Sequence, residues 1–86
     1  MAVTVLSFSQ KGCMACAEQA PINKATAAAL GIVIEELDAL ATHDAIAKYQ
    51  LKVTPTIVIV KDGEIKEKLE GVIQQEQLEA AVRKYL

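Results

Sequence analysis

The first half of the sequence has the pattern of a strand, a helix and a second strand. Residues 3–8 are mostly β-branched and apolar, residues 14–30 are rich in alanine, and residues 32–37 begin with the apolar run Ile-Val-Ile. Gly12 marks the turn before the helix, and Gly31 stands where a glycine ends many helices. Two strands joined by one helix lie parallel, with a right-handed crossover. The sequence therefore predicts a βαβ unit.

The next segment predicts a short helix followed by a buried strand. Residues 42–49 have a short helical pattern, and Thr42 or Asp44 is suited to cap its N-terminus through a side-chain oxygen. Residues 56–60, Thr-Ile-Val-Ile-Val, form a continuous apolar run. Such a run is typical of a strand that is buried on both faces. We therefore expect residues 56–60 in the middle of the sheet.

A hairpin and a last helix complete the pattern. Asp62-Gly63 is a strong signal for a two-residue hairpin turn, and residues 64–69 form the return strand. The lysines and glutamates of that strand suit a sheet edge. Residues 75–86 carry four apolar side chains at helical spacing, namely Leu78, Ala81, Val82 and Tyr85. The order βαβ, short helix, ββα predicts an α/β fold with a four-stranded mixed sheet flanked by helices.

Length and charge limit the classes of protein to which the chain can belong. The 86 residues are expected to form one domain, residues 1–86. The formal net charge of -2, with lysines and glutamates interspersed, argues against a nucleic-acid binder, which normally carries a basic patch. No apolar run approaches the ~20 residues that cross a bilayer. We expect a monomer with neither nucleic-acid nor membrane partners.

The N-terminal segment MAVTVLSFSQ indicates a strand that the mature chain keeps. It lacks the basic segment of a signal peptide and leads directly to the cysteines. Cys13 and Cys16 are the only cysteines of the chain. A lone Cys-x-x-Cys in a chain without a signal peptide is more often catalytic or metal-binding than structural. The expected location is the cytoplasm.

The placement of the cysteine pair favours redox chemistry. Cys13 follows a predicted strand and begins a predicted helix, where free backbone N–H groups and the helix dipole stabilise a thiolate. Cys16 lies about one turn later, within reach of the Cys13 sulfur. Cys13 would attack a substrate disulfide and Cys16 would resolve the mixed disulfide. This chemistry needs no cofactor, and we expect none.

Metal binding is the sharpest alternative from another class. A closed zinc site needs four ligands, of which two cysteines supply half, and His43 is the sole histidine. We expect no metal ligands within one chain. A metal-binding or cluster-bridging module that shares Cys13 across a dimer stays open at this point, as does a redox-inert interaction module.

Two long stretches of the sequence resemble the thioredoxin superfamily. The stretch VTVLSFSQKGCMACAEQAPI is similar to that family's first core strand, active-site turn and kinked helix, with Pro21 at the family's offset from the second cysteine. Downstream, IAKYQLKVTPTIVIVKDGEIKEKLEGV resembles its tyrosine, its Pro-Thr strand, its hairpin and the glycine that follows. The match covers most of the chain. In lacking an extra N-terminal strand and helix, the chain is similar to glutaredoxins and to the small thioredoxin-like proteins of prokaryotes.

The resemblance implies further site residues beside the cysteines. Pro55 would be the cis-proline that faces the active-site disulfide, and Thr54 would offer backbone groups to an extended substrate peptide. Gly71 corresponds to the glycine of the neighbouring loop. Met14, between the cysteines, is expected to be exposed and to contact partner proteins. The implied function is that of a protein disulfide reductase acting on disulfide-containing proteins, with a thioredoxin-type reductase as electron donor.

The chain departs from the family at positions that influence the cysteines. Gly12 stands where thioredoxins have tryptophan, and Ser7 replaces the buried acid of the first strand. The lysine that neighbours this acid falls near Glu36. Because a serine is no base near neutral pH, proton transfer at Cys16 requires another group, for which Glu36 or water is the candidate.

The sequence argues against glutathione as a partner. A glutaredoxin-type glutathione-dependent reductase would carry a Gly-Gly-Asp-like element after the hairpin, whereas this chain reads EGVIQQEQ. Lys11 is better interpreted as a solvated surface side chain than as a ligand for a glutathione carboxylate. The dipeptide Met14-Ala15 matches neither the Gly-Pro of thioredoxin nor the Pro-Tyr of glutaredoxin. The reduction potential therefore stays open.

Overall fold

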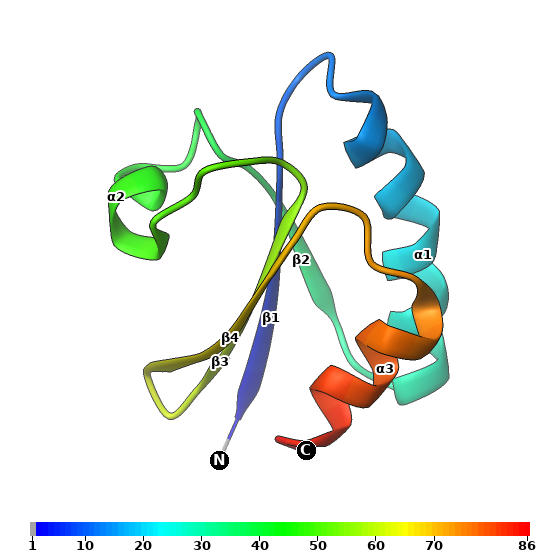
Figure 1. Ribbon diagram of the computed structural model, residues 1–86. Helices are drawn as coiled ribbons and strands as arrows, with labels where there is room; N and C mark the ends of the chain where they lie inside the picture. The colour runs from blue at the N-terminus through cyan, green and yellow to red at the C-terminus, as the bar shows by residue number, and fades with distance from the viewer. Residues whose placement is uncertain (1) are drawn as a thin grey trace.

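The computed structural model describes residues 2–86 and contains four strands and three helices within them (Figure 1). In chain order these are β1 (Val3–Ser9), α1 (Met14–Leu30), β2 (Ile34–Asp38), α2 (Ala45–Tyr49), β3 (Thr56–Lys61), β4 (Glu64–Glu70) and α3 (Gln75–Arg83). The predicted order, βαβ, a short helix and ββα, is confirmed. None of the helices in this part of the chain has the length and apolar character needed to cross a membrane.

The strands form one mixed sheet with the order β2-β1-β3-β4. β1 pairs parallel with β2, as a βαβ unit requires, and antiparallel with β3, while β4 pairs antiparallel with β3. The predicted four-stranded mixed sheet is therefore confirmed. Helices α1 and α3 cover one face of the sheet and α2 lies over the other (Figure 1).

The two faces of the sheet bury two separate hydrophobic clusters. Because side chains alternate along a strand, neighbouring residues of β1 and β3 contribute to opposite faces. The cluster under α3 is made of Val5, Ile57, Ile59, Leu78, Ala81 and Val82. The cluster under α2 is made of Leu6, Phe8, Ala39, Ala45 and Val58. β1 and β3 therefore form the centre of the fold, as the apolar run of residues 56–60 predicts.

The second strand begins two residues later than predicted. Gly31 adopts the left-handed conformation, with φ 65°, and the N–H of Ile32 donates to Ala27 O at 3.0 Å. The same carbonyl also accepts from the N–H of Gly31, and the two bonds together close the end of α1. Val33 is 81% exposed. Ile32 thus completes the helix end and β2 begins at Ile34.

The capping prediction for the short helix is wrong in its chemistry. Asp44 does occupy the N-cap position of α2, but its side chain makes no capping hydrogen bond. Its backbone is left-handed, with φ 56°, and its carboxylate lies 2.9 Å from Nε2 of His43. The carboxylate therefore contacts the neighbouring imidazole. The helix is also shorter than predicted, because it begins only at Ala45.

The hairpin and the last helix follow their sequence signals. Asp62 and Gly63 have φ values of 54° and 79°, as a type I′ turn requires at both central positions. α3 ends at Arg83, earlier than the predicted residue 86. The N–H of Tyr85 donates to Val82 O at 3.0 Å, an i to i−3 bond that tightens the last turn.

Leu78 is expected to anchor α3 to the sheet. It is fully buried in the cluster under α3. Leu78→Ala should lower the free energy of unfolding by about 2–5 kcal/mol, because it removes buried methyl groups and leaves a cavity. Leu86→Ala is the control, since Leu86 is 61% exposed, and should change stability by less than about 0.5 kcal/mol. Urea denaturation of both variants measures the difference, and equal effects would contradict this view of the core.

Candidate active site

The cysteine pair lies at the junction between β1 and α1. After β1 the chain turns at Gly12, whose φ of 82° is one that residues with a Cβ rarely adopt. The N–H of Cys13 donates to Gln10 O at 3.1 Å and closes this turn. Cys13 is then the N-cap residue of α1. The strand and the turn therefore place the Cys13 sulfur at the positive end of the helix.

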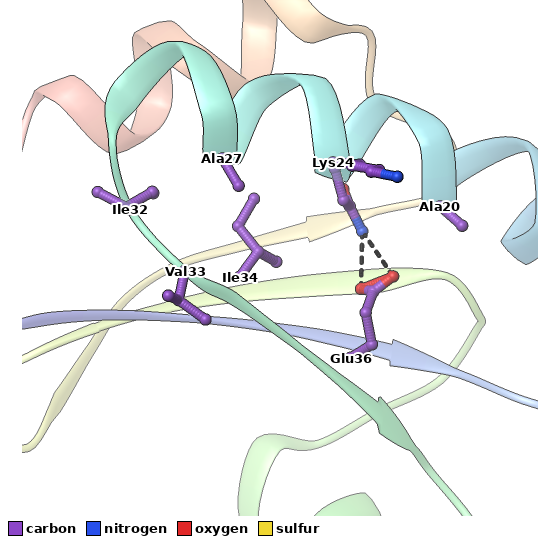
Figure 2. Close-up of a pocket in the computed structure, with 8 residues that line it drawn as sticks. Ala20, Lys24, Ala27, Ile32, Val33, Ile34 and Glu36 are labelled. Atoms are coloured by element: carbon purple, nitrogen blue, oxygen red, sulfur yellow. Dashed lines mark hydrogen bonds between the residues drawn. The ribbon is translucent and has the colours of Figure 1, made fainter.

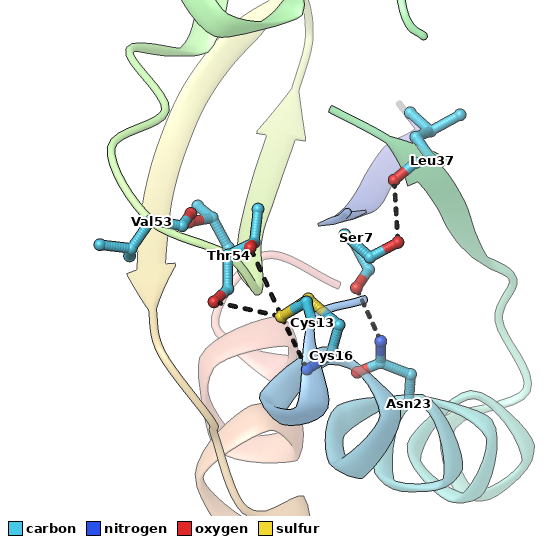
Figure 3. Close-up of a disulfide and its surroundings, with 9 residues drawn as sticks. Ser7, Cys13, Cys16, Asn23, Leu37, Val53 and Thr54 are labelled. Carbon is cyan, nitrogen blue, oxygen red and sulfur yellow. Dashed lines mark hydrogen bonds between the residues drawn. A yellow bond between two sulfur atoms is a disulfide. The ribbon is translucent and has the colours of Figure 1, made fainter. Parts of the chain in front are cut away.

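Cys13 and Cys16 are joined by a disulfide, with their Cα atoms 5.2 Å apart (Figure 3). The N–H of Cys16 donates to Cys13 Sγ at 3.1 Å. Cys16 is buried, with 8% of its surface exposed, whereas Cys13 is partly exposed. An incoming molecule therefore meets Cys13 first and Cys16 lies behind it.

The segment before β3 contacts the Cys13 sulfur. Thr54 Oγ1 donates a hydrogen bond to Cys13 Sγ at 3.5 Å, and Thr54 O lies 3.7 Å from the same sulfur (Figure 3). The Thr54–Pro55 peptide bond is cis, as the family resemblance implies, and Pro55 is buried. Residues 41 positions apart in the sequence thus meet at one sulfur atom.

The loop after β4 forms the third part of the site. The N–H of Gly71 donates to Pro55 O at 2.9 Å and continues the pairing of β3 with β4 by one residue. Gly71 has a φ of 83°. Met14, at the start of α1, is 87% exposed, as its sequence position predicts. The structure therefore gathers Cys13, Thr54, Pro55 and Gly71 at one end of the sheet, with Met14 beside the disulfide.

The inner face of α1 is polar, a feature that the sequence reasoning missed. The four buried residues of this helix are Cys16, Gln19, Asn23 and Thr26. Their spacing of three, four and three residues places them on one face of a helix. That spacing was a signal, but polar residues in an alanine-rich helix are commonly interpreted as exposed.

Asn23 links three elements through its side-chain amide. Its Nδ2 donates to Ser7 Oγ at 2.8 Å and to Glu36 Oε2 at 3.0 Å. Its Oδ1 accepts from Gln19 Nε2 at 3.0 Å. Ser7 and Asn23 are buried, at 3% and 2% exposure, whereas Glu36 is exposed. The polar groups that face α1 are therefore paired with one another.

Glu36 reaches this network from the solvent side. It is the register partner of Ser7 across β1 and β2 and lines a groove of about 490 Å³ between α1 and β2 (Figure 2). The dashed lines in Figure 2 are its bonds from Asn23. Among residues 2–86 it makes no hydrogen bond with Cys16, so a role for Glu36 in proton transfer stays a hypothesis.

The other candidate ligands lie at the surface. His43 is 95% exposed in its side chain and contacts Asp44. Within residues 2–86, no three or more His, Cys, Asp and Glu side chains come together in a way that could hold a metal ion. Lys11 is exposed and makes none of the ion pairs of this part of the chain.

Comparison with known proteins gives a consistent result. The family model for thioredoxin matches residues 2–84. Thioredoxin-1 of Caenorhabditis elegans is 32% identical over 75 residues, which make up 86% of this chain and 65% of that protein. Among solved structures, thioredoxin-2 of a malaria parasite has a TM-score of 0.88 at 25% identity, covering 96% of this chain and 82% of that one. Fasciola hepatica thioredoxin has a TM-score of 0.86 at 25% identity, covering 98% and 81%.

Asn23 is expected to be the least replaceable polar residue of the inner helix face. Asn23→Leu has a similar volume but leaves Ser7 Oγ and Gln19 Nε2 without one partner each. Unpaired buried polar groups should lower the free energy of unfolding by about 2–4 kcal/mol in total. Lys24→Leu, at the exposed neighbouring position, is the matched control and should have little effect. Chemical denaturation of both variants measures the change in stability. An unchanged midpoint for Asn23→Leu would contradict the role of Asn23 as a partner for buried polar groups.

Proposed function

The chain belongs to the thioredoxin family, and from this premise we propose that it is a thiol–disulfide oxidoreductase that reduces disulfides in proteins. The observation that carries the proposal is the position of the Cys13 sulfur. It is partly exposed at the N-terminus of α1, contacts Thr54, and is joined to a buried Cys16. The matched region spans 65% of the C. elegans thioredoxin. The proposed activity therefore rests on the geometry of this site and not on that relative as a whole.

The reaction takes place in two exchange steps at sulfur. In the reduced protein, the Cys13 thiolate attacks one sulfur of a substrate disulfide, that S–S bond breaks, and the other substrate sulfur leaves as a thiolate. Cys16 then loses its proton and attacks Cys13 Sγ in the mixed disulfide. The substrate sulfur that was bound to Cys13 leaves as a thiolate, which takes up a proton. The substrate gains two electrons and the Cys13–Cys16 disulfide forms.

Three groups around Cys13 favour its thiolate over its thiol. The N–H of Cys16 donates to Sγ at 3.1 Å, and Thr54 Oγ1 donates at 3.5 Å. The free N–H groups at the start of α1 add the positive end of the helix dipole. Hydrogen bonds to the charged form of a group stabilise that form. Cys13 is therefore the nucleophile and Cys16 the resolving cysteine.

An extended substrate segment would bind across the neighbouring loops. The carbonyl of Thr54 lies next to the reacting sulfur, and the N–H of Gly71 binds the carbonyl of the following residue, Pro55. Such a segment can pair with exposed backbone groups in the manner of an added strand. Met14, which is 87% exposed, offers a flexible apolar contact beside the sulfur.

The proposal extends to partners and location. The disulfide formed in each cycle must be reduced again, and a thioredoxin-type reductase would supply the two electrons. A lone redox pair that cycles between dithiol and disulfide fits a reducing compartment, which supports the cytoplasm. The loop 71–74 reads Gly-Val-Ile-Gln, and this composition does not support glutathione as a partner.

Single-cysteine variants test the proposal. The protein is expected to accelerate the reduction of insulin by dithiothreitol, and Cys13→Ser should lower the rate to that of dithiothreitol alone. Cys16→Ser keeps the nucleophile and should accumulate a mixed disulfide on Cys13, visible by mass spectrometry. Ala17→Ser, at an exposed position of the same turn, is the control and should keep full activity. The proposal fails if the unaltered protein does not accelerate the reaction.

A further inference from the structure

Gln19 makes contacts that its place in the helix does not explain. It lies one turn after Cys16 on the inner face of α1 and is 1% exposed. Holding the amide of a buried glutamine in hydrogen bonds costs conformational entropy, because a long side chain loses its rotational freedom. A leucine or methionine would fill the same volume without needing partners. The partners of Gln19 therefore indicate what it does.

Both ends of the Gln19 amide bind one residue of the loop after β4. The N–H of Ile73 donates to Gln19 Oε1 at 2.8 Å, and Gln19 Nε2 donates to Ile73 O at 3.1 Å. The second hydrogen of Nε2 goes to Asn23 Oδ1 at 3.0 Å. Paired donor and acceptor bonds fix both the position and the orientation of the loop backbone against α1.

These bonds close a ring around the reacting sulfur. From Ile73 the chain runs back two residues to Gly71, whose N–H donates to Pro55 O at 2.9 Å. Thr54, next to Pro55, contacts Cys13 Sγ. Cys13 begins the helix that carries Gln19. The side chain of Gln19 is thus the link that joins the cysteine helix to the loop on the far side of Pro55.

We propose that Gln19 is a positioning residue. It fixes the distance between the cysteine turn and the loop 71–73, which form the two sides of the substrate-binding surface. The inference rests on the proposed function. Gln19 touches neither the substrate nor the reacting atoms. It acts through Ile73 and Gly71, so that an extended protein segment joined to Cys13 finds the loop backbone at a fixed place.

The proposal distinguishes two kinds of substrate. A protein disulfide extends beyond the sulfur and meets the loop 71–73, whereas a small disulfide such as hydroxyethyl disulfide meets the Cys13 sulfur alone. Gln19→Met keeps the volume of the side chain and removes both bonds to Ile73. The change should therefore affect the protein substrate and leave the thiolate chemistry of Cys13 unaltered.

The test compares kcat/KM for insulin and for hydroxyethyl disulfide. For Gln19→Met we expect a fall of about five- to tenfold with insulin, mostly through KM, because two hydrogen bonds that order the loop are lost. With hydroxyethyl disulfide the change should stay within about twofold. Exchange of the Ile73 amide hydrogen should accelerate in the variant. Glu18→Met, at the exposed neighbouring position, is the matched control and should leave both substrates and the exchange rate unchanged.

The outcomes separate this inference from the function on which it rests. If the unaltered protein reduces neither substrate, the proposed function fails. If it reduces both and Gln19→Met lowers both equally, or lowers neither, the positioning role is overturned. Should Gln19→Met not fold, Gln19→Leu takes its place, because it also removes both bonds to Ile73 and places no charge against Ile73 O and Asn23 Oδ1. A selective loss with insulin is again expected, and an equal loss with both substrates overturns the role.

Discussion

The antiparallel pairing of β1 with β3 is the constraint on which the site depends. The register places Phe8 opposite Thr56, so that the end of β1 lies beside the beginning of β3. The chain that leaves β1 toward Cys13 therefore meets the chain that enters β3 through Pro55. A slip of one residue would turn the side chains of one of the two strands to the opposite face of the sheet. Core burial thus secures the contact between Cys13 and Thr54, although neither residue belongs to the core.

The helix that carries the cysteines is held mainly by polar contacts. Its buried face consists of Cys16, Gln19, Asn23 and Thr26, whereas α3 buries Leu78, Ala81 and Val82. Buried polar groups cost free energy unless they are paired. Asn23 finds partners on β1 and β2, Gln19 on the loop after β4, and Thr26 on a carbonyl of its own helix. Such pairing is directional, whereas apolar packing is not. α1 is therefore oriented by specific bonds, which suits a helix whose N-cap residue, Cys13, holds its sulfur against the loop before β3.

The sequence predicts the elements well and their polar contacts poorly, for physical reasons. Periodicity and turn residues are local, so the bounds of α1, the hairpin at Asp62-Gly63 and the order of strands are predicted correctly. The cis bond at Pro55 comes from the family resemblance and not from any local pattern. The spacing of Gln19 from Cys16 and Asn23 places it on one helix face, but its pairing with Ile73 spans 54 residues, so no local pattern identifies that partner. The start of β2 is predicted two residues too early for a similar reason, since Ile32 closes the end of α1 instead of pairing with β1.

The reacting and the supporting parts of the site have different origins. Cys13, Cys16 and Pro55 match the thioredoxin pattern, and the structure joins the two cysteines in a disulfide and gives Pro55 a cis peptide bond. The groups behind them do not match, since Ser7 replaces a buried acid, and the amides of Gln19 and Asn23 pair with a loop and with Glu36. The hydroxyl of Ser7 and the amides of Gln19 and Asn23 cannot serve as a base near neutral pH, but they can fix the backbone that they bind. In this chain the inner face of α1 therefore presents paired amides and a hydroxyl where the family pattern places a buried charge.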